Sequence, residues 1–276
     1  MKISKINLYE VIVPAKKGTI ESKEINKPLH KLSRGTDMGW SIQFDQLSKI
    51  LISIELSNGV IGWGECYRGN DFGEVKQIAE KFIGTDIETI IRQKIPIPYT
   101  RIYDGFECAI WDSFATLKNI RVVDLLGGTV RDKVKVGSWS SHRSTIEVGD
   151  IALNFDKMGY DCIKFKTDLE DDVVGWAEAI KTVAPNMKII FDPNERWISP
   201  SEVKTRIDHL KEIGNTLCIE DPIARWKLVE YSNLKNYSSI PIVLHVSLPY
   251  VDHGQRINDA IKAIQQNAVD GFNFNC

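Results

Sequence analysis

The hydrophobic pattern changes along the chain, and the change predicts two domains. In the first part, residues 49–56 alternate between apolar and polar side chains, Ser57–Gly59 provides a hairpin turn, and residues 60–66 return as a second strand. Apolar positions at helical spacing then predict a helix from Asp104 to Lys118. We therefore expect an N-terminal α+β domain over residues 1–125.

From Val134 onward, short apolar strands alternate with helical segments. This alternation, at about 25 to 30 residues per unit, is the βα pattern of a parallel sheet. Because no GxGxxG motif follows the first strand, we predict an α/β fold with a (β/α)8 TIM-type barrel over residues 126–276, rather than a doubly wound sheet. The predicted strands cover residues 134–139, 162–166, 189–192, 217–220, 241–245 and 271–275, and the helices cover residues 146–158, 173–184, 201–213 and 257–267.

The chain ends at Cys276, within or just after the sixth predicted strand. An eight-stranded barrel with only its first six strands has two open edges, because closure fixes strand tilt and shear together. We therefore expect an incomplete chain, truncated after about the sixth strand. As an isolated monomer it should be poorly stable and inactive.

Composition narrows the function classes. The chain has 276 residues, of which 43% are hydrophobic and 26% charged, with a formal net charge of -2. These values are ordinary for a globular protein and give no electrostatic reason to expect nucleic acid or an anionic membrane as a partner. No apolar run approaches the length of a membrane helix, and the N-terminus lacks the apolar region of a signal peptide. The cytoplasm is the expected location.

Charged or ionisable residues close four successive predicted strands. Lys166, Asp192, Glu220 and His245 follow one another at intervals of 25 to 28 residues, about one βα unit each. In a barrel, this spacing brings the side chains to the C-terminal mouth, where catalytic groups lie. A capping or surface charge would explain any one of them. It does not explain four in succession, because a charge at a buried strand end is unfavourable unless it is paired or bound to a metal.

The types of these residues suit a metal site. Two carboxylates, an imidazole and open positions favour a hard cation, Mg²⁺ or Mn²⁺. His245 is the weakest member of the set, because a histidine at a strand end is also explained by an ordinary hydrogen bond. If His245 is a ligand, its nitrogen favours Mn²⁺ or a softer ion in vitro, whereas magnesium is favoured by its availability.

Several sequence blocks resemble a known family. Residues 105–118 (GFECAIWDSFATLK) and residues 123–128 (VDLLGG) are similar to the signature helix of the mandelate racemase and muconate lactonizing branch of the enolase superfamily. The motifs KFK at residues 164–166, DPN at 192–194 and EDP at 220–222 follow in that family's order and spacing. The resemblance covers essentially the whole chain, and the motifs are specific jointly rather than singly. It implies an N-terminal capping domain, a modified barrel, Mg²⁺, and removal of the proton alpha to a substrate carboxylate through an enediolate.

The resemblance also implies roles for single residues. Lys166 matches the catalytic base, and Lys164 matches the lysine that lowers its partner's pKa and contacts the substrate carboxylate. A neighbouring cation does lower the pKa of a lysine, as an amine base near pH 7 requires. Asp192 and Glu220 match the first two metal ligands, and Asn194 matches a residue close to the metal. The cation would hold the substrate carboxylate and stabilise the enediolate.

Two positions depart from the family's pattern. The fifth-strand motif usually supplies Asp or Glu as the third ligand, whereas His245 stands at one of the two ligand positions here. On the sixth strand, members that act on both faces of the substrate carry a Lys, or an Asp that pairs with a histidine. The alignment places Asn275 there. Because Asn cannot accept a proton, a one-base reaction fits better than a two-base racemase or epimerase.

The leading interpretation is therefore a lyase that dehydrates a polyhydroxy (sugar) acid. Lys166 would take the α-proton, and an acid would help the hydroxide to leave. A racemase, epimerase or cycloisomerase is the second interpretation, with any second base in a missing C-terminal part. A non-catalytic relative that binds a metal or a ligand is the third.

Substrate identity lies beyond these motifs. In the family it is set by capping-domain loops, which here correspond to residues 15–42 and the segment Tyr67–Asp71. Trp40, Tyr67 and Arg68 are candidate substrate contacts, although ordinary surface placement explains them equally well. We expect a small-molecule carboxylate as the substrate and a homo-oligomer for the full-length form.

Overall fold

The computed structural model describes residues 1–14, 30–31, 41–42, 46–67, 69–98, 100, 102–246 and 253–274. The chain divides into two compact units. The N-terminal unit is built mainly from residues 1–14 and 46–134, and the C-terminal unit mainly from residues 135–248 and 256–276. The domain boundary expected between residues 125 and 126 stays a prediction.

An antiparallel sheet forms the base of the N-terminal unit. Strands β1 (Ile3–Pro14), β4 (Gln46–Leu56) and β5 (Ile61–Cys66) pair in the order β1-β4-β5. The turn between β4 and β5 closes with a hydrogen bond from the Gly59 amide to the Leu56 carbonyl at 2.8 Å, and Gly59 has a φ of 86°. A positive φ at this position favours glycine. The predicted hairpin is therefore confirmed.

The described part of this unit also contains the helices α1 (Phe72–Phe82), α2 (Ile87–Gln93), α3 (Tyr103–Lys118) and α4 (Val122–Leu125). Helix α3 covers strand β5 at very close range. A Cβ atom added to Gly62 would lie 2.2 Å from the backbone nitrogen of Ser113, and one added to Gly64 would lie 2.1 Å from the carbonyl oxygen of Gly105. Only glycine at these two strand positions lets the helix and the sheet approach so closely.

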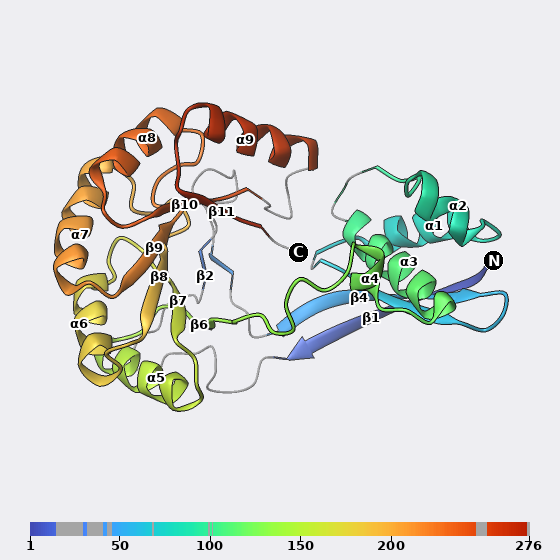
Figure 1. Cartoon of the computed structure of the whole chain (residues 1–276), viewed down its shortest axis with the longest axis horizontal. Coiled ribbons are helices and arrows are strands. Elements are labelled where there is room, and N and C mark those ends of the chain that lie inside the picture. Colours follow the sequence, from blue (N-terminus) through green and yellow to red (C-terminus); the bar gives the residue numbers. More distant parts are fainter. Residues whose placement is uncertain are drawn as a thin grey trace. The chain divides into compact units, whose positions relative to one another are not determined.

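A parallel sheet forms the centre of the C-terminal unit. Its six strands pair in sequence order, and all the pairs are parallel. In Figure 1, the helices of this unit form an arc along one face of these strands. The strands are β6 (Ser138–Ser140), β7 (Cys162–Lys166), β8 (Lys188–Asp192), β9 (Thr216–Glu220), β10 (Ile242–His245) and β11 (Gly271–Asn273). The helices are α5 (Thr145–Lys157), α6 (Val173–Val183), α7 (Pro200–Ile213), α8 (Leu228–Tyr237) and α9 (His253–Gln265).

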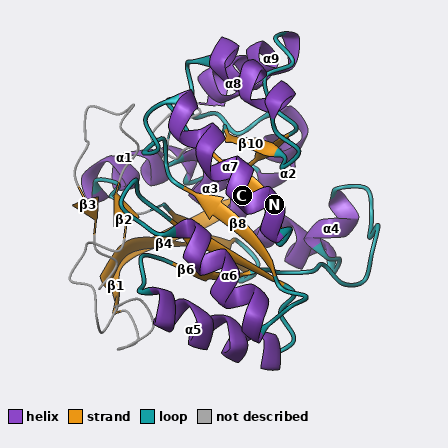
Figure 2. Ribbon diagram, turned by 90° about the vertical axis from the view of Figure 1, so that its left-hand side faces the viewer, coloured by secondary structure: helices purple, strands orange, loops and turns teal. Residues whose placement is uncertain are grey.

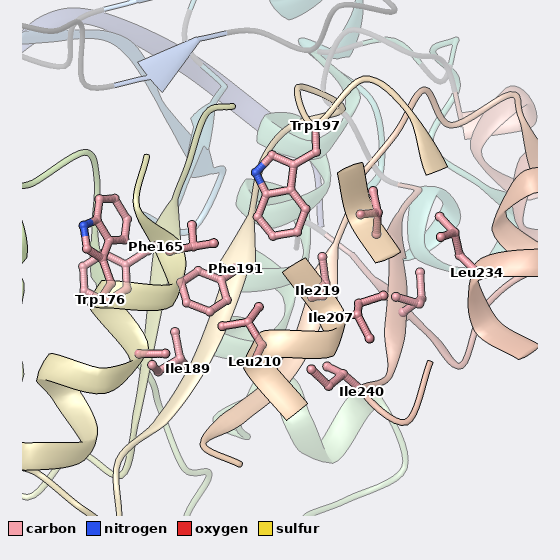
Figure 3. Close-up of a cluster of buried hydrophobic side chains, with 14 of the residues drawn as sticks. Phe165, Trp176, Ile189, Phe191, Trp197, Ile207, Leu210, Ile219, Leu234 and Ile240 are labelled. Carbon is pink, nitrogen blue, oxygen red and sulfur yellow. The ribbon is translucent and has the colours of Figure 1, made fainter. Parts of the chain in front are cut away.

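The main core lies between the sheet and these helices. The rings of Phe165 and Trp176 pack with their centroids 5.3 Å apart, and further apolar side chains of β8, β9, α7 and α8 continue the layer (Figure 3). Neighbouring helices α5 and α6 pack side by side, as Figure 2 also shows. Because side chains alternate along a strand, Ile163 and Phe165 fill this core while Lys164 and Lys166 share the opposite face of β7.

The first and the sixth predicted strands differ in their bounds from the structure. The sequence pattern indicated a strand over residues 134–139, whereas β6 covers only Ser138–Ser140. Val134 and Val136 are 71% and 67% exposed, so their alternation with polar residues does not reflect a buried face. The sixth strand is also shorter than predicted and ends at Asn273. In the part of the chain that the structure describes, no helix is long and apolar enough to cross a membrane.

Candidate active site

Four consecutive strands bring their last residues to the carboxyl edge of the parallel sheet. Lys166 ends β7, Asp192 ends β8, Glu220 ends β9 and His245 ends β10. The register pairs Lys166 directly with Asp192. Each strand is an apolar run that stops at a charged or ionisable residue, so strand formation by itself places these side chains along one edge.

Two lysines and two carboxylates meet at this edge. The Lys164 ammonium nitrogen lies 2.8 Å from Asp192 Oδ2 and donates a hydrogen bond to Glu220 Oε2 at 2.7 Å. Lys166 forms an ion pair with the same Asp192 oxygen and donates to Asn194 Oδ1 at 3.1 Å. Asp192 is 0% exposed and Glu220 3% exposed. Five predicted site residues are thus gathered in one buried, charge-paired cluster.

The two carboxylates respond differently to this environment. Burial alone would raise the pKa of Asp192, but the ammonium groups of Lys166 and Lys164 outweigh burial and hold that pKa below its usual value. Burial, together with the negative charge of Asp192, raises the pKa of Glu220, and Lys164 opposes the rise only in part. The difference follows from the contacts, because Asp192 pairs with both lysines and Glu220 with Lys164 only.

Lys164 is held in its charged form. Its burial favours the neutral amine, but Asp192 and Glu220 outweigh burial and raise the Lys164 pKa above the ordinary lysine value. A charged Lys164 is suited to contact an anionic group. The expected base is instead Lys166, two residues further along the same face of β7.

His245 stands beside this cluster without an ion pair at hydrogen-bond distance. Its Nδ1 lies 3.7 Å from Glu220 Oε1, which is too long for a hydrogen bond. Its buried Nε2 has no hydrogen-bond partner among the described residues. Burial lowers the pKa of His245 to about 4. The imidazole is therefore neutral near pH 7, with one ring nitrogen free to donate a lone pair.

The donors at this edge fit a hard divalent cation in their chemistry. Asp192 and Glu220 offer carboxylate oxygens that already share one cationic group, and His245 offers an unpartnered nitrogen. Within the described ranges, however, no group of three or more His, Cys, Asp or Glu side chains is spaced to hold a metal ion. The lysine ammonium groups lie against the carboxylate oxygens instead. The three-residue ligand set therefore stays a prediction.

Sequence reasoning missed one residue of this cluster. Asn273, at the end of β11, donates a hydrogen bond from Nδ2 to Glu220 Oε1 at 2.9 Å, and the register places it opposite His245. The family alignment points to Asn275, two positions later in the sequence and outside the described residues. Searching every second residue of that strand for polar side chains would have found Asn273.

The backbone that follows β8 and β9 is unusual. Asn194, Glu195 and Asp221 have φ values of 47°, 66° and 45°, in the left-handed region that non-glycine residues seldom adopt. Such residues persist only where the surrounding structure fixes them, and they are concentrated at functional sites. All three residues lie one to three positions after the site carboxylates Asp192 or Glu220 in the sequence.

A further buried group of polar side chains joins the loops after β6, β7 and β8. His142 Nδ1 lies 2.6 Å from Asp171 Oδ2, and both side chains are almost completely buried. Arg196 Nε donates to Asp168 Oδ1 at 3.1 Å. No motif pointed to these residues, because neither partner closes a strand and the pairs join separate βα loops.

Four predicted substrate contacts remain untested. Trp40, Arg68 and Asn275 lie outside the described residues. Tyr67 belongs to the N-terminal unit, where the Lys49 ammonium nitrogen lies 5.7 Å from the centroid of its ring. The roles assigned to these four residues stay predictions.

Residues 148–276 match the family described as enolase C-terminal domain-like. The chain is 26% identical over 275 residues to o-succinylbenzoate synthase from Bacillus subtilis, which covers 93% of this chain and 67% of that protein. It is 28% identical over 219 residues to D-galactonate dehydratase from Cronobacter sakazakii, which covers 70% of this chain and 56% of that protein. The chain spans about half to two thirds of the length of the curated relatives it matches.

A solved structure shares the fold. The dipeptide epimerase from Cytophaga hutchinsonii, in complex with Mg and the dipeptide D-Ala-L-Val, superposes with a TM-score of 0.75 at 21% identity. The superposition covers 99% of this chain and 71% of that one. The predicted fold class, a modified (β/α)8 barrel with an N-terminal α+β capping domain, is confirmed by this likeness together with the six parallel strands and the small antiparallel sheet.

Proposed function

Because the chain belongs to the mandelate racemase and muconate lactonizing branch of the enolase superfamily, we propose that it removes the proton alpha to the carboxylate of a small-molecule acid. The observation that carries the proposal is the meeting of Lys164 and Lys166 with Asp192 and Glu220 at the carboxyl edge of the sheet. This edge is where barrels of this type hold their catalytic groups. The relatives are enzymes and include lyases, isomerases and epimerases.

Lys166 is the base in this proposal. Lys166 follows the buried Phe165 on a short strand whose residues all pair with β8. The backbone therefore fixes the direction in which the Lys166 side chain leaves the strand. In the structure it contacts Asp192 and Asn194, and it would exchange these contacts for the α-proton of the substrate. Lys164, held charged by Asp192 and Glu220, would attract the substrate carboxylate.

Asp192, Glu220 and His245 would hold a divalent cation, which in this superfamily is typically Mg²⁺, with Mn²⁺ as an alternative. When bound, the cation supplies a positive charge that neutralises the substrate carboxylate and favours its enediolate form. Asn273 and Asn194 would orient the carboxylates, since Asn273 donates to Glu220 and the Asn194 amide donates to Asp192 Oδ1 at 3.1 Å. Lysines freed from these carboxylates would become available to the substrate.

Dehydration of a polyhydroxy (sugar) acid is the leading reaction. Its support is the similarity to D-galactonate dehydratase and the presence of Asn275 where a second base would be needed. Lys166 would take the α-proton, the β-hydroxyl would leave as water with a proton from an acid, and the enol would become a keto acid. Racemisation, epimerisation or cycloisomerisation is the alternative, supported by relatives named as an epimerase and a cycloisomerase.

One experiment separates these reactions. The full-length form is incubated in D₂O with Mg²⁺ and a panel of acids that includes D-galactonate and the dipeptide D-Ala-L-Val, and the products are followed by NMR. A keto acid supports dehydration, and α-deuterium incorporation without elimination supports an isomerase. A panel in which no acid exchanges or reacts would contradict the proposed function and favour a non-catalytic relative. Cytoplasmic location and a homo-oligomeric full-length form stay predictions.

A further inference from the structure

A second layer of buried polar and charged side chains lies directly behind the site carboxylates. Arg225, in the loop after β9, donates from Nε to Glu195 Oε1 at 2.6 Å, and its Nη2 lies 3.6 Å from Asp221 Oδ2. The Glu195 and Asp221 side chains are 0% and 1% exposed, and that of Arg225 is 17% exposed. Glu195 follows Asp192 by three residues, and Asp221 follows Glu220 directly. The guanidinium thus joins the two loops that carry these carboxylates.

Backbone hydrogen bonds extend this connection across three strands. The Glu195 amide donates to the Asp221 carbonyl at 2.7 Å, and the Asp221 amide donates to the Val243 carbonyl at 3.0 Å. Asp221 Oδ1 accepts from the His245 amide at 2.9 Å. The ends of β8, β9 and β10 are therefore tied to one another through Glu195, Arg225 and Asp221. Asp192, Glu220 and His245 are the last residues of those same three strands.

The conformation of these residues needs such support. Glu195 and Asp221 both have positive φ values, and a glutamate gains nothing locally from that conformation. Residues of this kind stay in place only where their surroundings fix them. The ion pair to Arg225 and the amide-to-carbonyl bond between Glu195 and Asp221 provide that restraint. Without it, the loop after β8 would relax and change the direction of the Asp192 carboxylate.

We infer that Glu195, Arg225 and Asp221 form a positioning cluster that holds the strand ends bearing Asp192, Glu220 and His245, so that these side chains can converge on a divalent cation once the lysines release the carboxylates. The lysines contact Asp192, Glu220 and Asn194, whereas Arg225 contacts the residues that stand behind them. The cluster therefore acts through the ligands, not on the substrate. The inference rests on the proposed function, since it assumes that these three residues bind the cation.

A double-mutant cycle separates positioning from stability. Removing one partner of a buried ion pair leaves an unpaired charge and destabilises the fold, whereas neutralising both partners restores much of the stability. Glu195→Gln and Arg225→Met are therefore compared singly and together in the whole chain. Mn²⁺ affinity is measured by electron paramagnetic resonance or calorimetry, and the melting temperature is measured on the same samples. Lys235→Met is the matched control, because Lys235 forms an ion pair with Asp270, which precedes β11 at the opposite edge of the sheet.

The expected result is a double variant that melts close to the wild type but binds Mn²⁺ about 10- to 100-fold more weakly, as is usual when residues that orient metal ligands are lost. The two single losses should be non-additive in the double variant. Lys235→Met should bind Mn²⁺ as the wild type does. A stable double variant with wild-type Mn²⁺ affinity would overturn the positioning role alone. A wild type that binds no Mn²⁺ would overturn the metal-dependent function and this inference with it.

Discussion

The two units bury different kinds of side chain. Among the described residues of the N-terminal unit, the buried polar side chains are Ser53 and Ser113, and Ser113 donates to the Ala109 carbonyl at 2.7 Å. In the C-terminal unit, buried Asp, Glu, Arg and His side chains cluster at and just beyond the carboxyl ends of the strands. Both units have continuous apolar cores. Packing therefore does not require the buried charges, and function is the better explanation for them.

The two units also differ in where they place apolar and charged side chains. The N-terminal unit builds its sheet and helix layer on close glycine contacts and on a core of apolar side chains. The C-terminal unit uses the same kind of apolar layer on the helix side of its sheet and places charges on the other side of β7. Changes to its charged edge should affect activity and metal binding most. Changes to the apolar layers should affect stability most.

The largest expected effect comes from the charged edge. In the full-length form, Lys166→Ala should lower turnover by about 10²- to 10⁴-fold, because it removes the proposed base, while Mn²⁺ affinity stays within a few-fold. Steady-state kinetics and metal titration on the same protein provide the measurement. Lys188→Ala is the matched control, since Lys188 begins the neighbouring strand β8 and its Nζ contacts the Gly214 carbonyl at 3.3 Å. Near wild-type turnover in Lys166→Ala would reassign the base, first to Lys164.

The next effect belongs to the N-terminal unit. Phe106 is 0% exposed and stacks on Phe82 with ring centroids 5.3 Å apart. Phe106→Ala should destabilise this unit by about 3 to 5 kcal/mol, because it removes apolar contacts and leaves a cavity. Denaturant unfolding followed by circular dichroism measures the loss. Phe72, which is 36% exposed, provides the control, and an equal loss from Phe72→Ala would show that burial does not decide the effect.

The smallest effect tests buried polarity away from the charged edge. Asn215 is 0% exposed, precedes β9 at its amino end, and donates to the Ala177 carbonyl at 2.8 Å. Asn215→Ala should reduce stability by about 1 to 3 kcal/mol through the lost hydrogen bond. Turnover and Mn²⁺ affinity should change less than twofold. A large loss of Mn²⁺ affinity in a variant that remains folded would mean that the functional region is not confined to the carboxyl edge.

Much of the C-terminal unit was predictable because four of its strands, β7 to β10, are mainly apolar and end at a charged or ionisable residue. The strand Cys162–Lys166 and the ends at Asp192, Glu220 and His245 agree with the prediction for this reason. The first barrel strand was misplaced because Val134 and Val136 alternate with polar residues while remaining exposed. An alternating pattern predicts a buried face only where a partner covers it.

Other features depend on contacts that sequence spacing does not reveal. Glu195 and Arg225 are 30 residues apart in the sequence, where both resemble ordinary charged surface residues. Glu195 has a positive φ in the turn after β8, and its side chain accepts a hydrogen bond from Arg225. The pairing of Lys164 with both carboxylates likewise needed three strands to be placed side by side. The sequence predicted which residues reach the edge, but not how they divide their contacts.

The central claim is that the buried charges at the carboxyl edge form a divalent cation site. Its most direct test is Mn²⁺ titration of the whole chain, with Asp192→Asn and Glu220→Gln as the site variants and Asp270→Asn as the control, because Asp270 lies at the opposite edge of the same sheet. The wild type and Asp270→Asn should each bind one Mn²⁺ ion. Each site variant should bind Mn²⁺ about 10²-fold more weakly or worse, because the two carboxylates provide most of the attraction. Unchanged Mn²⁺ affinity in both site variants would contradict the account.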